Sequence, residues 1–239
     1  MIDPALLPTR RVDWNNAVRI INSSYPTIDL FDDIADPADW PLLISAEQKT
    51  NPRIMDAIGN LDLIPPARRV GGNGASYLMA PLTHVSLDRP SRFSRGAYGV
   101  IYIGRTFETA LFETMYHYGS FMMSTHEPPG WASQFRELVL NIDVTLHDLR
   151  AREHPSFNEA LDSLNHVESQ RLGEQLRAQL SEGVAYPSQR YPGGECVGLF
   201  YPDRATLPIQ GRHMDYHWDG TRVDMYRVTG TPEIWRVTA

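Results

Sequence analysis

The chain has 239 residues, of which 42% are hydrophobic and 21% charged, a composition that excludes disordered and collagen-like proteins. With 22 basic and 29 acidic residues the net charge is −7, which argues against a nucleic-acid binder with a basic face. The one cysteine, Cys196, excludes an intramolecular disulfide and is typical of a reducing compartment. We find no apolar run long enough for a membrane span and no signal-peptide core, so we expect a cytoplasmic protein without membrane or direct nucleic-acid contact.

The first sixty residues are predicted to be mainly helical. Apolar residues at near-helical spacing predict an amphipathic helix over residues 12–24. Short apolar pieces in the acidic, proline-rich stretch that follows predict short helices over residues 30–35 and 40–48. We therefore expect residues 1–60 to form a helical N-terminal extension, followed by one compact domain over residues 61–239.

The middle of the chain reads as strands followed by a helix. Residues 68–85 and 97–104 are rich in Val, Ile and Tyr and broken by Gly and Pro, which predicts strands. Thr106 is a suitable N-cap for a helix over residues 107–119 that Gly119 would end.

The remainder alternates in type. Residues 135–149 predict a strand, and residues 157–183 predict a helix closed by Gly183, with five leucines on one buried face: Leu161, Leu164, Leu172, Leu176 and Leu180. Loop, turn and strand are expected over residues 184–203, and short strands over 220–230 and 233–239. The order of elements predicts the α+β class, a mixed sheet decorated by helices.

Two patterns that suggest chemistry have a plainer interpretation. His213 and His217 have a zinc-helix spacing, but Tyr216, Trp218 and the turn after them favour a strand, in which the two rings lie too far apart for one metal. We predict no metal site. Cys196 precedes an apolar run, so we expect a buried structural thiol rather than a nucleophile.

Two other features are ambiguous on their own. The glycines of residues 71–74 could admit a phosphate, but no helix pattern is evident after them, so we interpret them as a turn, with Arg68 and Arg69 beside it. Glu113 emerges from a largely apolar helical turn, which is a known setting for a working carboxylate.

Taken together, the motifs resemble the RES-domain family, toxins of type II toxin–antitoxin systems. Arg92-Phe93-Ser94 is similar to the family's first arginine element, and Tyr102 follows it at the end of a strand. Glu113 lies eleven residues beyond in the ETALFET helix, and Ser188 in YPSQR precedes a Pro-Gly-Gly turn. A further family arginine, on the first strand of the domain, falls at Arg69 or Arg68.

The resemblance implies a fold and an activity. The fold would be similar to ADP-ribosyltransferases, a split mixed sheet whose central cleft holds NAD+. The activity would be destruction of NAD+ by cleavage of the nicotinamide–ribose bond, with water or inorganic phosphate as the acceptor and no permanent cofactor.

The resemblance also implies residue roles. Glu113 would stabilise the positive charge that develops on the ribose. Arg69 and Arg92 would clamp phosphate groups, while Tyr102 and Ser188 would position the nicotinamide end. Arg69 and Ser188 thus count with Glu113 as catalytic candidates, and Arg69, Arg92, Tyr102 and Ser188 as binding candidates.

The expected partner is a cognate antitoxin of the Xre or helix-turn-helix type. Two alternatives remain open from sequence: transfer of ADP-ribose to a macromolecule, and an inactive RES-like binding module. Whether the chain forms a homo-oligomer is also open.

Overall fold

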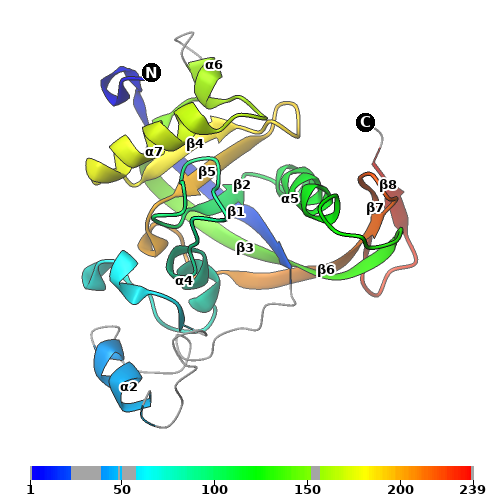
Figure 1. The fold of residues 1–239 in the computed structure, drawn as a ribbon, viewed down its shortest axis with the longest axis horizontal. Coiled ribbons are helices and arrows are strands. Elements are labelled where there is room, and N and C mark those ends of the chain that lie inside the picture. The colour runs from blue at the N-terminus through cyan, green and yellow to red at the C-terminus, as the bar shows by residue number, and fades with distance from the viewer. Residues whose placement is uncertain (1, 23–38, 48, 50–57, 152–156, 238–239) are drawn as a thin grey trace.

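The computed structural model describes residues 2–22, 39–47, 49, 58–151 and 157–237. A mixed sheet runs through the molecule, with helices packed against it (Figure 1). This confirms the α+β class. Within these ranges no helix combines the length and apolar character needed to cross a bilayer.

The sheet contains the strands β1 (Thr9–Asn22), β2 (Ile101–Gly104), β3 (Gly130–Asp148), β4 (Gly183–Pro187), β5 (Glu195–Leu199), β6 (Ile209–Trp218), β7 (Val223–Val228) and β8 (Ile234–Arg236). The α-helices are α2 (Trp40–Glu47), α4 (Ser76–Thr83), α5 (Phe107–Met122), α6 (Phe157–Ala160) and α7 (Val167–Ala178). Short 3-10 helices cover Pro4–Leu6, Leu61–Leu63, Pro66–Arg68 and Pro202–Arg204.

Five strands, β1, β2, β5, β4 and β3, form a closed ring. The strand order is β1-β2-β5-β4-β3-β6-β7-β8, and β1 also pairs with β3. The β1–β3 pairing is antiparallel, from Thr9 opposite His147 to Asn22 opposite Phe135, whereas β4 runs parallel to β3. Because β3 also pairs with β6, it joins the closed strands to the ribbon of β6, β7 and β8.

The helix predicted over residues 12–24 is wrong, because residues 12–22 belong to β1; residues 23 and 24 lie outside the described part of the chain. A register shift between Trp14 and Ala17, with Asn16 at a φ of 57°, interrupts the two-residue alternation of buried side chains. Because of this bulge, the buried residues Trp14, Ala17 and Val18 are three and four positions apart, which is the spacing of one helix face. The helical character expected of the N-terminal extension therefore fails for β1, which is an integral strand of the sheet, although residues 40–47 do form α2.

The strand predicted over residues 68–85 is also wrong, since it contains α4. Six of the eight α4 residues are buried. A helix buried on most sides shows no amphipathic period, so the pattern could not distinguish it from a buried strand. The glycines of residues 71–74 are thus followed by a helix after all. The short helix predicted over residues 30–35 lies outside the described residues.

Helix α5 is confirmed, and its N-cap is as predicted: Thr106 accepts a hydrogen bond from the amide of Thr109. Gly119 does not end the helix, which continues to Met122. The glycine is buried where α5 contacts Val223 and Trp218.

The long helix predicted over residues 157–183 is two helices, α6 and α7. The Asp162 carboxylate accepts hydrogen bonds from the amides of Leu164 and Asn165, which turns the chain between them. Leu164 lies in this turn and Leu180 lies beyond the end of α7, and both are exposed, whereas Leu161, Leu172 and Leu176 are buried as predicted. Gly183 starts β4. The strands expected at residues 97–104, 135–149, 184–203, 220–230 and 233–239 are confirmed as β2, β3, β4 with β5, β7 and β8.

We expect Gly173→Ala to lower the free energy of unfolding. A methyl group there would lie 2.1 Å from the Phe93 carbonyl oxygen and 2.8 Å from the Tyr98 hydroxyl. Overpacking costs about 1–3 kcal/mol, more than the about 1 kcal/mol that alanine gains over glycine in a helix. Urea unfolding measures the difference, with Gly130→Ala as control because nothing lies within 4 Å of its added methyl. Equal stability of Gly173→Ala and the parent would contradict the packing of α7 on residues 93–98.

Candidate functional site

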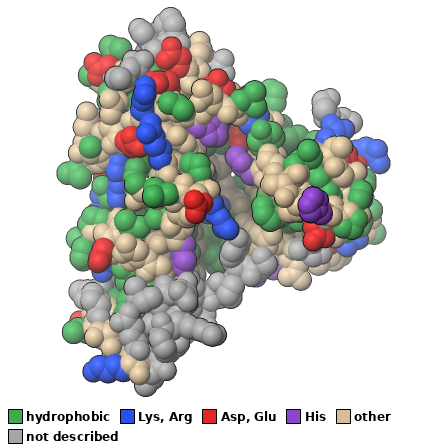
Figure 2. Space-filling view, in the orientation of Figure 1, with side chains coloured by type: hydrophobic (Ala, Val, Ile, Leu, Met, Phe, Trp, Pro, Cys, Tyr) green, Lys and Arg blue, Asp and Glu red, His purple; other side chains and the backbone are tan. Residues whose placement is uncertain are grey.

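A cavity of about 430 Å³ lies where the strand ring meets α5. Side chains from three separate parts of the core meet in its wall, among them Val18, Ile103 and Cys196. Figure 2 shows this face hollowed beside α5, with histidine side chains at the edge of the hollow. The polar and ionisable side chains lining the cavity are Arg19, Ser91, Arg92, Tyr102, Glu113, Thr114, His117, His166, Tyr186 and Cys196.

Glu113 is held from one side by a turn far away in the chain. The Ser188 hydroxyl donates to Glu113 Oε1 at 2.6 Å, and the Gln189 amide donates to the same oxygen at 3.2 Å. Ser188 Oγ in turn accepts from the amides of Arg190 and Tyr191. Oε1 is therefore fixed, while Oε2 has His117 Nε2 at 3.8 Å. The structure brings the two predicted residues together and leaves one carboxylate oxygen for a ligand.

Tyr102 is buried against the loop that precedes β2. Its hydroxyl donates to Ser91 Oγ at 2.9 Å and accepts from the Phe93 amide at 3.0 Å. Burial raises the pKa of Tyr102, so the phenol is neutral. Because the hydroxyl is committed to this loop, Tyr102 offers its ring to the cavity and positions the neighbouring Arg92.

Arg92 points along the wall without a carboxylate partner among the described residues. Its Nη1 donates to the carbonyl oxygens of Asp162 at 2.9 Å and Ala160 at 3.4 Å. These contacts anchor one end of the guanidinium and leave the rest of its donors for a ligand.

Neither Arg69 nor Arg68 lines the cavity. Arg69 donates to the carbonyl oxygens of Ile64 and Leu61, both at 3.0 Å. Arg68 is paired with Glu182 and Asp203. Both side chains therefore hold loops in place, and the structure does not bring either of them into the cavity with Glu113.

The cavity receives its second arginine from β1. Arg19 Nη1 donates to the Tyr102 carbonyl oxygen at 3.3 Å, and its Nε is buried with no hydrogen-bond partner in the described structure. Burial lowers the pKa of Arg19 to about 10, so the side chain remains a cation at neutral pH. Sequence reasoning missed Arg19 because it assigned residues 12–24 to a helix. The sequence signal that could have found Arg19 is a charged residue between two apolar ones, Val18 and Ile20, in the segment that forms β1.

Cys196 is a structural thiol at the floor of the cavity. It is 3% exposed and free, and burial followed by the proximity of Glu113 raises the pKa of its thiol. It is therefore protonated at neutral pH and a poor nucleophile, as predicted. His213 and His217 lie on β6, and His217 Nδ1 is 2.7 Å from Asp224 Oδ1. Within the described residues no three His, Cys, Asp or Glu side chains group as metal ligands.

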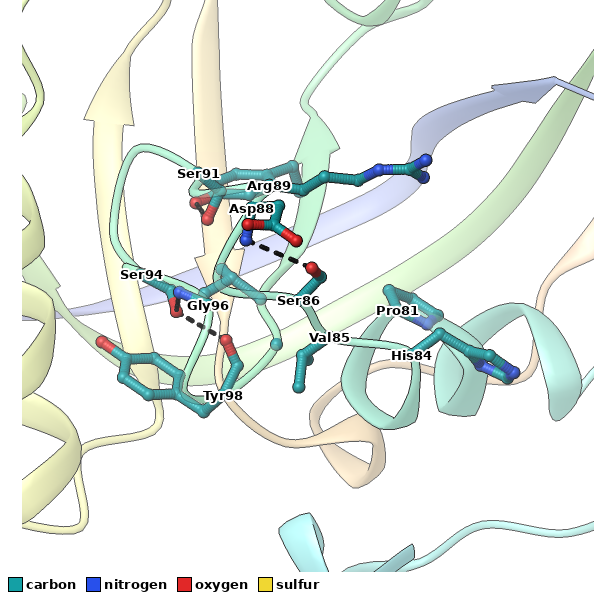
Figure 3. A pocket seen from close by; sticks show the side chains of 13 residues that line it. Pro81, His84, Val85, Ser86, Asp88, Arg89, Ser91, Ser94, Gly96 and Tyr98 are labelled. Atoms are coloured by element: carbon teal, nitrogen blue, oxygen red, sulfur yellow. Dashed lines mark hydrogen bonds between the residues drawn. The ribbon is translucent and has the colours of Figure 1, made fainter. Parts of the chain in front are cut away.

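A second hollow, of about 510 Å³, shares Ser91 and Tyr102 with the first in its lining and is drawn in Figure 3. Ser94 in its wall is bonded locally: its hydroxyl donates to the Tyr98 carbonyl oxygen and accepts from the Gly96 amide. It lacks a carboxylate held as Glu113 is held. The smaller cavity is therefore the candidate active site.

The family model of the RES domain matches residues 66–219. The chain belongs to the RES-domain family. The family resemblance carried by Arg92, Tyr102, Glu113 and Ser188 is thereby confirmed, and all four lie within the matched residues. Arg19 and β1 precede the RES match, so the site contains a cation from outside it.

Two further similarities concern the whole RES-domain chain. It is 23% identical over 209 residues to uncharacterized protein y4oC of Sinorhizobium fredii, an alignment that covers 87% of this chain and 84% of that protein. It also aligns with a crystal structure of the M. tuberculosis MbcT–MbcA toxin–antitoxin complex, with a TM-score of 0.42 and 13% identity over 88% of this chain and 87% of that chain.

We expect Arg19→Met to stabilise the fold. The change removes a desolvated cation that no described carboxylate neutralises, and relief of such functional strain is typically worth about 0.5–2 kcal/mol. Chemical denaturation measures the gain, with Arg11→Met as control because Arg11 is exposed and paired with Asp143. A clear loss of stability in Arg19→Met would show that Arg19 is structural.

Proposed function

We propose that this RES-domain protein is the toxin of a toxin–antitoxin system and depletes NAD+ by cleaving its nicotinamide–ribose bond. The observation that carries the proposal is Glu113, fixed through one oxygen by Ser188 and open through the other, in a cavity with two arginines that no described carboxylate neutralises. The toxin role and a cognate Xre or helix-turn-helix antitoxin follow from the family resemblance.

The carboxylate suits the chemistry of the bond. Loss of nicotinamide leaves the ribose with oxocarbenium character, a positive charge that a preorganised carboxylate stabilises. Ser188 and the Gln189 amide restrain Glu113, so little reorganisation is needed as that charge develops.

The arginines suit the rest of the molecule. NAD+ carries a diphosphate, and planar guanidinium groups bind phosphate oxygens with two hydrogen bonds at once. Arg150 shows the contrasting, structural use of arginine in this protein, because it is paired with both Asp148 and Glu195. Arg19 and Arg92 have no such partner in the described structure, which favours an anionic ligand.

The direct test is nicotinamide release from NAD+, with and without inorganic phosphate, followed by the phosphorus spectrum of the product. We expect many turnovers, and a loss of about 10²–10³ in kcat for Glu113→Gln, the range typical of one lost charge-stabilising contact. Glu108→Gln, in the first turn of the same helix, is the matched control. No turnover by the folded parent protein without a macromolecular acceptor would overturn NAD+ depletion and favour a transferase or a binding module.

We expect Arg92→Lys to raise KM for NAD+ about tenfold, the effect of losing one hydrogen bond to a charged group, while kcat changes less. A single ammonium cannot both hold the Asp162 carbonyl and present a fork to the diphosphate. Arg95→Lys is the control, since Arg95 is paired with Glu174 on the surface. A fall in kcat at constant KM would contradict a binding role for Arg92.

A further inference from the structure

Two histidines line the cavity that contains Glu113. His117 lies one helical turn beyond Glu113 on α5, with its Nε2 3.8 Å from Glu113 Oε2. His166 is the N-cap residue of α7 and lines the same cavity from the opposite element. Neither residue belongs to the motifs discussed above.

His166 has an unused polar atom. Its Nε2 is buried and has no hydrogen-bond partner in the described structure. A buried polar atom without a partner costs about 1–3 kcal/mol, so native proteins rarely retain one without a function. In a cavity wall, such an atom is available to a ligand.

Two arginines, one histidine and one carboxylate lie close enough to His166 to influence it. Arg92 comes from the loop before β2, His117 from α5 and Arg190 from the turn after β4, while Asp162 from the α6–α7 loop is the one acidic group among them. Arg190 stacks on Tyr116 and donates to the Ser163 carbonyl oxygen, so no described carboxylate neutralises it either. The ligand that fits this surface is an anion.

We infer that His166, with His117 beside it, binds phosphoryl oxygens in the cavity and that this contact strengthens as the imidazole takes up a proton. The inference rests on the proposed function and extends it, since it names the residues that bind a phosphoryl group in the cavity that contains Glu113. The group is either the diphosphate of the dinucleotide or a free phosphate, which share this chemistry.

The direction of the pH effect follows from the surroundings. Burial, then Arg92, His117 and Arg190, lower the pKa of His166 below its ordinary value, so the free protein holds it neutral at pH 7. A bound anion raises that pKa again. Binding therefore tightens as the pH falls through the pKa of the complex toward the lower pKa of the free protein, and is weaker at pH 8 than at pH 6.

Calorimetry with ADP-ribose and with inorganic sulfate tests this at pH 6 and pH 8, because neither probe changes charge between these values. We expect the parent protein to bind more tightly at pH 6. His166→Gln should match it at pH 8 and bind about tenfold to a hundredfold more weakly at pH 6, the effect of one lost hydrogen bond between charged groups. His166→Ala should be weaker at both, and His117→Gln should lose part of the gain.

His126→Ala is the control, an exposed histidine outside the cavity that should keep the full pH dependence. A His166-dependent gain assigns the contact to the diphosphate if it is seen only with ADP-ribose or if ADP-ribose displaces sulfate, and to a free phosphate if sulfate keeps the gain while ADP-ribose is bound. Parent-like binding of His166→Gln at pH 6, or no binding of either probe by the parent, overturns the inference. If the parent releases nicotinamide while His166→Gln binds normally, this inference fails alone. If nicotinamide release is absent but the pH-dependent binding is present, NAD+ cleavage fails alone.

Discussion

The hydrogen bond from Ser188 to Glu113 joins residues 75 positions apart in the chain, and the geometry of the site depends on it. The serine hydroxyl has one proton to donate. Because its oxygen already accepts from the amides of Arg190 and Tyr191, that proton is directed to Glu113. The turn is itself closed by the Ser188 amide donating to the Gly194 carbonyl oxygen at 2.8 Å. The carboxylate of Glu113 on α5 is therefore fixed by the loop that joins β4 to β5.

Charge is distributed unevenly between the cavity and the remaining surface. The whole chain has a net charge of −7, yet the cavity contains two arginines, and one carboxylate lines its wall. Elsewhere Arg68 and Arg150 each contact two carboxylates. Net charge therefore describes the solvated exterior and misses a local anion site. Leaving cations desolvated opposes folding, which is the usual compromise at a functional site.

The parts of this fold that sequence predicts are those with local signals. The family resemblance singles out Glu113 and Ser188. The elements that carry them could be predicted, because helix α5 has a threonine cap and β4 and β5 flank a Pro-Gly-Gly turn. β1 and α4 could not, because a bulge disrupts one pattern and burial on most sides removes the other. The role of His166 depends on an unpaired atom, and no sequence pattern reports which buried atoms lack partners.

Arg19 shows why the first strand belongs to the site although it precedes the matched RES residues. Partial burial of a guanidinium costs desolvation free energy, so the surrounding structure must be stable enough to offset that cost. β1 is held by its long antiparallel pairing with β3 and by Val18 opposite Gly104 of β2. The same pairing closes the ring of strands, and it sets Arg19 beside the carbonyl of Tyr102, one residue from the start of β2. The β1–β3 pairing thus both closes the ring of strands and places Arg19 in the cavity, so loss of this pairing would remove both features.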